Sequence, residues 1–428
     1  MPAPSPGLEV RPFRALTYQQ RDPEHLARVS SPAYDLVTPS GRERLADADP
    51  HNIVRLILPV VDRPGAGADG APASRSADLA AQTLARWVQD GTLQREDMPA
   101  LWLYELRPPQ GAPTTVGWLG AVALPPEGST AVLPHEDTYP VAVEGRRALL
   151  AATVTDLEPI VLAHDPDPDV AELTARARQG PPTLELQDTD GVGHRLWRVA
   201  DAELLGRVTE ALGRTEAVIA DGHHRFAAAR AHSRAHPAAT GSDAILALVT
   251  PMGLGGLRVD PIHRVVPDLG LDVAVAAAAE GFRVTEVPLT SESVTSAVRR
   301  WLHDGGTGFL VTDGTRLVRL DDPSSAVLAA VPPEAPAAWR GLDVVLAHHG
   351  LIDLLWQRRD DAESVLIAHS VEAAVASAVE RDGVALLLRA PSPSDVAAVA
   401  RAGARMPRKS TLFVPKPRTG LVLRPLAD

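Results

Sequence analysis

Helical periodicity and short apolar runs of strand length intermix along the whole chain. They do not follow the strict strand–helix–strand alternation of a parallel sheet, so the pattern favours an α+β or irregular mixed α/β fold. At 428 residues the chain exceeds what one small core can organise, and we expect several domains. Changes in the pattern of expected helices and strands suggest an N-terminal α/β region (1–130), a central region (131–270) and a C-terminal α/β region (271–428) that ends in a basic loop.

Composition excludes several classes of protein. Cysteine is absent, which excludes disulfides, thiolate catalysis and cysteine-ligated zinc. No apolar run approaches a membrane span, and the amino terminus lacks the apolar core of a signal peptide, so the expected compartment is the cytoplasm. The net charge of -12 argues against general nucleic-acid binding, because that binding needs a basic surface that releases counterions.

One strand–turn–helix segment carries the densest set of functional side chains. An apolar strand precedes the turn, an alanine-rich helix follows it, and the turn reads Asp221-Gly222-His223-His224-Arg225. Gly222 permits a tight turn, and the helix start with Arg225 forms a candidate phosphate site. The two histidines can exchange a proton or bind metal, and Asp221 can cap the helix or reach Mg²⁺.

Two further motifs supply candidate site residues. Glu136, beside His135 in a predicted loop, is a candidate base or Mg²⁺ ligand, and the alternative is a loop salt bridge. His263 and Arg264 follow a glycine-rich stretch and form a candidate second anion clamp, or else are structural. We expect these residues and the turn to converge on one cleft.

The distribution of lysine is unusual. Only two of the 42 basic residues are lysine, Lys409 and Lys416, and both lie near the end of the chain. An ammonium is a compact point charge, whereas a guanidinium is a planar fork, so these positions indicate chemistry that arginine does not provide. With Ser410 and Thr411 they form a candidate anion-binding loop. The alternative is a terminal segment that packs on the surface.

Three short segments have a clear expected local structure. The apolar run at 53–58 predicts a strand. Asp190-Gly191 predicts the turn of a hairpin, and His348-His349 predicts the exposed surface of a helix.

The turn resembles the phosphate-binding turn of the ParB/sulfiredoxin superfamily, which includes a chromosome-partitioning nucleotide switch, an ATP-using sulfinate repair enzyme and free-serine kinases. This resemblance implies a ParB/sulfiredoxin-like core with added N- and C-terminal elements. It also implies a nucleoside di- or triphosphate with Mg²⁺ as cofactors. Sulfinate repair is excluded because its catalytic cysteine is absent.

Ordered motifs along nearly the whole chain resemble a bacterial and archaeal family known as domain of unknown function 1015. The motifs are Pro12-Phe13-Arg14-Ala15, Pro32-Ala33-Tyr34-Asp35, Pro50-His51-Asn52, His135-Glu136-Asp137-Thr138, the Asp221–Arg225 turn, Ile262-His263-Arg264, Leu342-Asp343 and the segment 406–421. Asp137 stands where the family usually has lysine, and Gly145 stands where an aspartate usually precedes Arg146. The resemblance also implies serine or phosphoserine chemistry.

The favoured hypothesis is a nucleotide-dependent phosphotransferase acting on a small hydroxylated metabolite. The turn would hold phosphates, Glu136 or a turn histidine would deprotonate the acceptor, and the lysines would stabilise the transferred charge. Two alternatives stay open. One is a nucleotide-binding switch without turnover, and the other is a metal-dependent hydrolase or phosphatase that uses His135, Glu136, His223 and His224.

Overall fold

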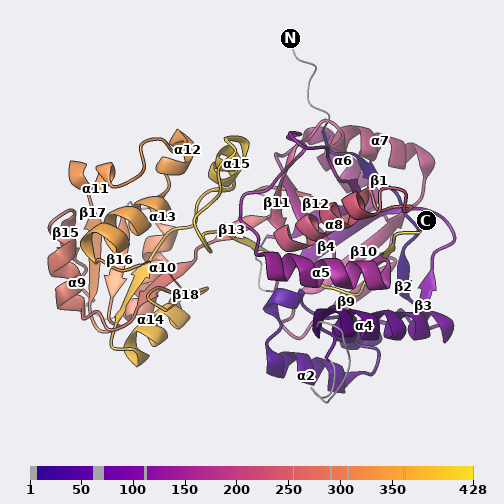
Figure 1. Cartoon of the computed structure of the whole chain (residues 1–428), viewed down its shortest axis with the longest axis horizontal. Coiled ribbons are helices and arrows are strands. Elements are labelled where there is room, and N and C mark those ends of the chain that lie inside the picture. The colour runs from indigo at the N-terminus through magenta and orange to yellow at the C-terminus, as the bar shows by residue number, and fades with distance from the viewer. Residues whose placement is uncertain are drawn as a thin grey trace, which may run out of the picture. The chain divides into compact units, whose positions relative to one another are not determined.

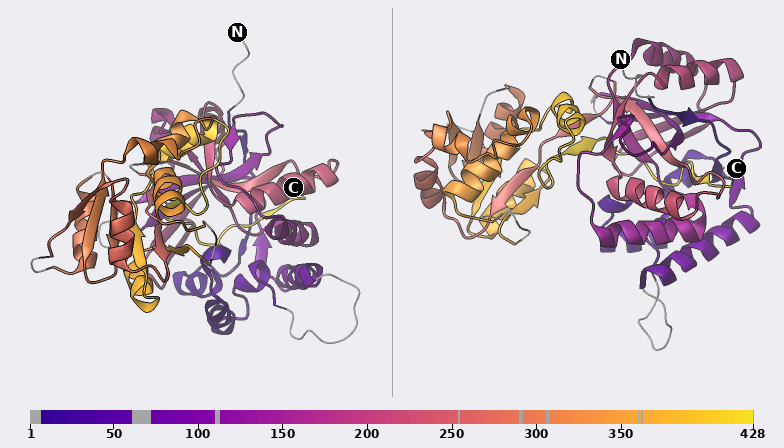
Figure 2. Two further views of the ribbon diagram at one scale, coloured as in Figure 1. Left: turned by 60° about the vertical axis from the view of Figure 1, so that its left-hand side comes forward. Right: turned by 45° about the horizontal axis from the view of Figure 1, so that its top comes forward.

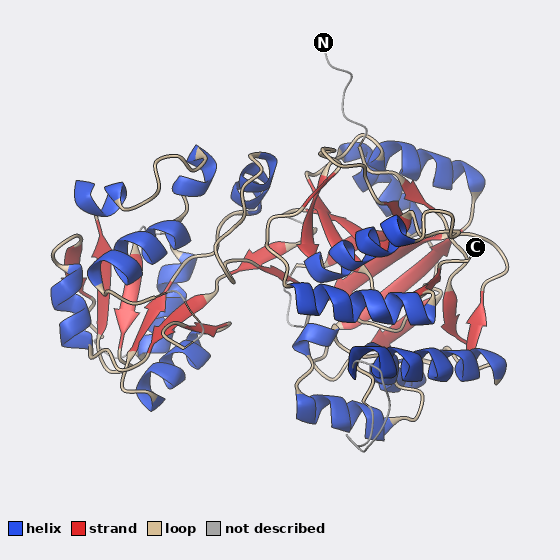
Figure 3. Ribbon diagram, in the orientation of Figure 1, coloured by secondary structure: helices blue, strands red, loops and turns tan. Residues whose placement is uncertain are grey.

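The computed structural model describes residues 7–60, 72–109, 113–253, 255–289, 292–305, 308–359, 361 and 363–427. Contacts divide the chain into unit 1, Met1–Arg258 with Pro415–Asp428, and unit 2, Val259–Val414. Both units combine helices with sheets, which confirms the predicted mixed α/β class (Figure 3). The final segment returns to unit 1, and the three regions expected from the sequence stay a prediction.

A mixed sheet forms the centre of unit 1 (Figure 1). Its strands run in the order β6 (Val132–Leu133), β11 (Ala217–Asp221), β8 (Ile160–His164), β12 (Ala244–Pro251), β5 (Thr115–Ala123), β4 (Leu101–Arg107), β10 (Gly193–Val199) and β9 (Leu184–Gln187), and β1 (Val10–Arg11) pairs with β5. The β6–β11 and β8–β12 pairs are parallel, and the other pairs are antiparallel. The turn after β11 therefore lies at the end of a strand with partners on both sides.

Helices cover both faces of this sheet (Figure 2). The described helices of unit 1 are α1 (Pro23–Val29), α2 (Pro39–Ala48), α3 (Val54–Ile57), α4 (Pro72–Gln89), α5 (Pro140–Thr153), α6 (Pro168–Ala177), α7 (Ala202–Leu212) and α8 (His223–Ala235). Alternation along β4 explains the two layers, since Leu101 and Leu103 pack with α6 and α7, whereas Trp102 and Tyr104 pack with α1 and α4. Two short pairs complete the unit, β2 (Leu16–Tyr18) with β3 (Leu93–Arg95) and β7 (Thr155–Asp156) with β21 (Arg424–Pro425).

Unit 2 contains an antiparallel sheet of its own. The strand order is β15 (Arg283–Glu286), β17 (Leu317–Asp321), β16 (Phe309–Thr312), β19 (Val384–Leu387), β14 (His263–Val266) and β18 (Leu366–Ala368), and β13 (Arg258–Asp260) pairs with β20 (Leu412–Val414). The helices are α9 (Leu271–Ala278), α10 (Val294–His303), α11 (Ser325–Ala329), α12 (Ala337–Arg340), α13 (Asp343–Leu346), a π-helical segment (Ala347–Leu355), α14 (Val371–Glu380) and α15 (Pro393–Arg401). Val298 of α10 and Ala374 of α14 pack with Val265 and Leu310 in its core.

The strand predicted at 53–58 is wrong, because α3 occupies these residues. Asn52 accepts a hydrogen bond from the Val54 N–H (2.9 Å) and starts the helical turn. A short, mostly buried apolar run has no periodicity that separates a strand from a helix, so tertiary packing decides. The predicted hairpin at Asp190-Gly191 is confirmed as the β9–β10 connection. None of the described helices is long and apolar enough to cross a membrane.

A leucine at the centre of the unit 1 sheet gives a stability prediction. Leu246→Ala should lower the free energy of unfolding by about 2–5 kcal/mol, because Leu246 is fully buried and truncation leaves a cavity. Leu36→Ala is the matched control, since Leu36 is 52% exposed, and it should cost less than about 0.5 kcal/mol. Urea unfolding measures both, and equal effects would contradict the assigned core.

Candidate functional site

The polar turn begins where β11 ends at Asp221. Gly222 has a φ of 95°, in the left-handed region, and a Cβ there would lie 2.6 Å from Cγ2 of Ile160. Glycine is therefore required both for the backbone conformation and for the close approach to β8. Helix α8 starts directly after it at His223, two residues earlier than the sequence suggests. Gly222 has no side chain that could cap this 13-residue helix, so its positive end faces the turn.

Asp221 lies between two cations. One carboxylate oxygen accepts from Arg225 Nη2 (2.5 Å), and the other lies 2.6 Å from Lys416 Nζ. The same ammonium also binds the carboxylate of Asp35. Arg225 is mostly buried, with 11% of its side chain exposed, and its Nη1 donates to the Pro159 carbonyl (2.6 Å). One of the two lysines thus lies at the predicted turn, and direct contact between Arg225 and a phosphate stays a prediction.

The carboxylates keep both cations charged. Burial alone would lower the pKa of Lys416, but Asp221 and Asp35 outweigh it and raise the pKa above its usual value. Arg225 follows the same rule, because Glu158 and Asp221 outweigh its desolvation and raise its pKa. The turn therefore holds a permanently charged ammonium close to the start of α8.

A buried glutamate connects this cluster to α5. Glu158 accepts hydrogen bonds from the Tyr34 N–H (3.0 Å) and the Thr419 hydroxyl (3.1 Å), and it lies 4.0 Å from Arg146. Burial raises the pKa of Glu158, although Arg225 and Arg146 oppose this. The guanidinium of Arg146 lies 4.2 Å from the centre of the Tyr34 ring.

His135, Glu136 and His223 lie together, as predicted. His223 Nε2 accepts from the His135 backbone N–H (3.3 Å), and its Nδ1 lies 3.7 Å from Glu136. The rings of His135 and His223 meet edge to face with centres 4.6 Å apart. Because Nε2 accepts, the neutral ring carries its proton on Nδ1, on the side of the carboxylate. Glu136 is 33% exposed and is the more accessible member of this group.

His224 lies apart from that group. It stacks on the Tyr139 ring, and its Nε2 accepts from the Tyr139 backbone N–H (3.2 Å). Among the residues that the structure describes, no group of three or more His, Asp or Glu side chains is arranged to hold a metal ion. Mg²⁺ binding by Asp221 and Glu136 stays a prediction.

A buried relay holds the final segment in unit 1. The Arg418 N–H donates to the Tyr104 hydroxyl (3.0 Å), and this hydroxyl donates to His194 Nδ1 (2.8 Å), because the other ring nitrogen of the neutral imidazole faces a carboxylate. His194 Nε2 then donates to Asp188 (3.1 Å), and the Arg418 guanidinium closes the ring 3.6 Å from the same carboxylate. Each buried polar group in this relay has a partner. The relay places Lys416, two residues before Arg418, at the turn.

The remaining predicted residues belong to unit 2, where several have internal partners. Arg264 is fully buried and donates to His348 Nε2 (3.0 Å) and to the Arg408 carbonyl (3.0 Å). His348 is therefore buried, and its predicted position on a helix surface is wrong because Arg264 needs an acceptor. His263 Nδ1 accepts from the Leu388 N–H (3.3 Å). A shared cleft with the turn stays a prediction.

The three residues of the loop at 409–411 differ in their exposure to solvent. Lys409 is exposed at a φ of 50°, Ser410 is buried, and Thr411 is half-buried beside β20. Anion binding by these three residues also stays a prediction.

Four residues of the cluster were not among the candidates from the sequence: Tyr34, Asp35, Arg146 and Glu158. Tyr34 and Asp35 stand in one of the family motifs, which was the available signal. Glu158 has no such signal, because a lone acidic residue after a helix is ordinary in sequence. Only its burial beside two arginines distinguishes it.

A model of the family described as "Protein of unknown function (DUF1015)" matches residues 10–345. The chain belongs to this family. The match covers every element of the cluster except the final segment with Lys416 and Arg418. A search of curated proteins finds no match.

Several solved structures are similar to the chain. A free serine kinase variant in complex with AMP has 13% identity and a TM-score of 0.33, over 72% of this chain and 90% of that one. SbnI with a C-terminal truncation from Staphylococcus aureus has 13% identity and a TM-score of 0.35, over 72% and 87%. A conserved hypothetical protein from Pyrococcus furiosus has 16% identity and a TM-score of 0.31, over 66% and 87%. With likeness this low, we base the function on the residues of this chain.

The relay gives a second prediction. Tyr104→Phe should lower the free energy of unfolding of unit 1 by about 1–3 kcal/mol, because the Arg418 N–H and His194 Nδ1 both lose their partner in a buried place. Tyr139→Phe is the matched control, since Tyr139 is 59% exposed. Denaturant unfolding followed by tryptophan fluorescence measures both, and a neutral Tyr104→Phe would contradict the relay.

His263 gives a prediction of pH dependence. Burial, with the nearby charge of Arg264, lowers the pKa of His263 to about 4. The unfolded chain binds this proton near pH 6.5, so unit 2 should lose about 3 kcal/mol of stability as the pH falls from about 6.5 to about 4. Unfolding at a series of pH values measures this, and His263→Gln should flatten the profile. Identical profiles for the two proteins would contradict it.

Proposed function

We propose that unit 1 is a nucleotide-dependent phosphotransferase that acts on a small hydroxylated metabolite. The observation that carries this proposal is the position of Lys416, whose ammonium lies between Asp221 of the turn and Asp35. Phosphoryl transfer depends on positioning and on stabilisation of negative charge, and this cluster supplies a fixed cation at a helix N-terminus. We expect the protein to work in the cytoplasm.

The charges divide into two roles. The start of α8 and Lys416 would bind the phosphates of a nucleoside di- or triphosphate. Asp35 and Asp221 come from separate segments and share one ammonium, so they form a carboxylate pair that already holds a cation. Asp221 would also bind the Mg²⁺ ion that accompanies the nucleotide, because Mg²⁺ takes one or two carboxylates plus phosphate oxygens.

Glu136 is the proposed base. In the transfer, the acceptor hydroxyl oxygen bonds to the terminal phosphorus while the bond from that phosphorus to the bridging oxygen breaks. The shortened nucleotide leaves with the electron pair, and the hydroxyl proton passes to Glu136. His223 lies against Glu136 and would orient it. Serine is the acceptor that the resemblance implies.

The geometry favours this function over a metal-dependent hydrolase. His223 and His224 each use Nε2 to accept a backbone N–H, so neither presents that nitrogen to a metal. A nucleotide switch without turnover would use the same phosphate contacts. Release of ADP in the presence of a hydroxylated acceptor separates the kinase from the switch.

The central test compares two cation-to-glutamine changes. Lys416→Gln should weaken binding of ADP with Mg²⁺ at least about tenfold, a loss of about 1.4 kcal/mol, because it removes the ammonium at the turn. Arg86→Gln is the control, since Arg86 is exposed on α4, and it should leave the affinity unchanged. Calorimetric titration of the full chain measures both.

A stably folded Lys416→Gln protein that binds ADP as tightly as the parent would refute the proposal. Lys409→Gln, measured in the same way, tests whether the second lysine contributes to binding as the sequence suggests.

A further inference from the structure

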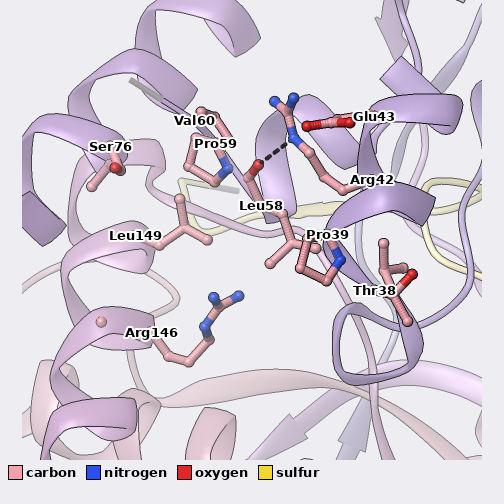
Figure 4. Close-up of a pocket in the computed structure, with 13 residues that line it drawn as sticks. Thr38, Pro39, Arg42, Glu43, Leu58, Pro59, Val60, Ser76, Arg146 and Leu149 are labelled. Atoms are coloured by element: carbon pink, nitrogen blue, oxygen red, sulfur yellow. Dashed lines mark hydrogen bonds between the residues drawn. The ribbon is translucent and has the colours of Figure 1, made fainter. Parts of the chain in front are cut away.

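A pocket of about 650 Å³ opens in unit 1 between α2, α4 and α5 (Figure 4). Its volume lies within the range of about 300–1,000 Å³ that is typical of small-molecule sites. Much of the wall is apolar, including Leu58 and Leu149, and its charged side chains are Arg42, Glu43 and Arg146.

Two guanidinium groups supply donors to this pocket. Arg146 extends from α5 among the lining residues, and its Nη1 donates to the Ile57 carbonyl (3.1 Å). Arg42 extends from α2, and its Nε donates to the Leu58 carbonyl (3.2 Å), the bond drawn in Figure 4. Within the described residues, neither Nη atom of Arg42 forms a hydrogen bond or ion pair. Planar guanidinium groups of this kind bind carboxylates well.

The pocket adjoins the ion cluster through Arg146. The Arg146 guanidinium lies 4.2 Å from the Tyr34 ring centre, and that of Arg225 lies 5.6 Å from the same centre. The buried carboxyl group of Glu158 interacts electrostatically with both guanidinium groups. A ligand in the pocket would thus lie one aromatic ring away from the proposed phosphate site.

We propose that this pocket binds the phosphoryl acceptor, and that the acceptor is a hydroxylated organic acid with an apolar chain. Arg42 and Arg146 attract its carboxylate, and Leu58 and Leu149 cover the chain. The nucleoside part of a nucleotide is uncharged and would leave both arginines without an anion, whereas its phosphates belong at the turn. Serine has the carboxylate but lacks the chain, so it would fill only part of the pocket. This inference rests on the proposed function.

Gly145 offers a test that replaces no residue of the cluster. It lies on α5 in the pocket lining, and a Cβ added there meets no atom within 4 Å. Gly145→Asp places a carboxylate in the pocket lining, and Gly145→Asn places a neutral group of the same shape there. The probes are 2-hydroxyhexanoate and its methyl ester, titrated into the full chain by calorimetry without nucleotide. ADP with Mg²⁺ is titrated separately into the same proteins.

The acid should bind the parent protein at least about tenfold more tightly than the ester. Gly145→Asp should weaken binding of the acid at least about tenfold relative to Gly145→Asn, because the new carboxylate repels the probe. ADP affinity should be the same in both variants. Equal binding of acid and ester, equal affinities in the two variants, or no binding of the acid by a protein that binds ADP would each overturn the inference. Those outcomes leave the proposed function standing, which fails separately if ADP binding does not depend on Lys416.

Discussion

The architecture of unit 1 depends on the burial of Arg418. Its guanidinium donates to the Ser30 hydroxyl (2.7 Å) and to the carbonyls of Ala27 and Ser30, and it lies against Asp188. A buried charge is costly unless such partners surround it, so the final segment can occupy only this path. That path closes the relay through Tyr104 and brings Lys416 to the turn. The family model ends before this segment, yet the proposed site is incomplete without it.

The site is an array of paired charges. Lys416, Arg225 and Arg146 lie against Asp35, Asp221 and Glu158, and five segments of the chain contribute to the array. Neighbouring pairs share a charged group, so these side chains are held in place without a ligand. Phosphoryl transfer depends on charges that are preorganised in this way. The pocket beside Arg146 adds room for a second substrate next to this array. The proposed phosphate site and the proposed acceptor pocket together would serve a two-substrate reaction.

Unit 2 shows why a charged motif in a sequence can indicate either a binding site or a buried structural contact. Ile262-His263-Arg264 has the composition of an anion clamp, but Arg264 and His263 satisfy protein groups inside their own unit. The physical reason is that a strand as buried as β14 leaves its polar side chains no water, so they need internal acceptors or donors. A ligand of this motif could bind only through donors and acceptors that do not already bond protein groups.

The sequence by itself determined the mixed α/β class, the β9–β10 hairpin and the strand–turn–helix at Asp221–Arg225, because each depends on periodicity or on neighbours a few residues apart. Gly222 predicted the turn for the same reason, because the positive φ that favours glycine is a property of the local backbone. Tertiary structure alone decided that Val54–Ile57 form a helix, that His348 is buried and that Asp35 meets Lys416 across 381 residues of chain. No local pattern encodes such a distant pairing, because it forms only when packing and the burial of Arg418 fix the path of the final segment.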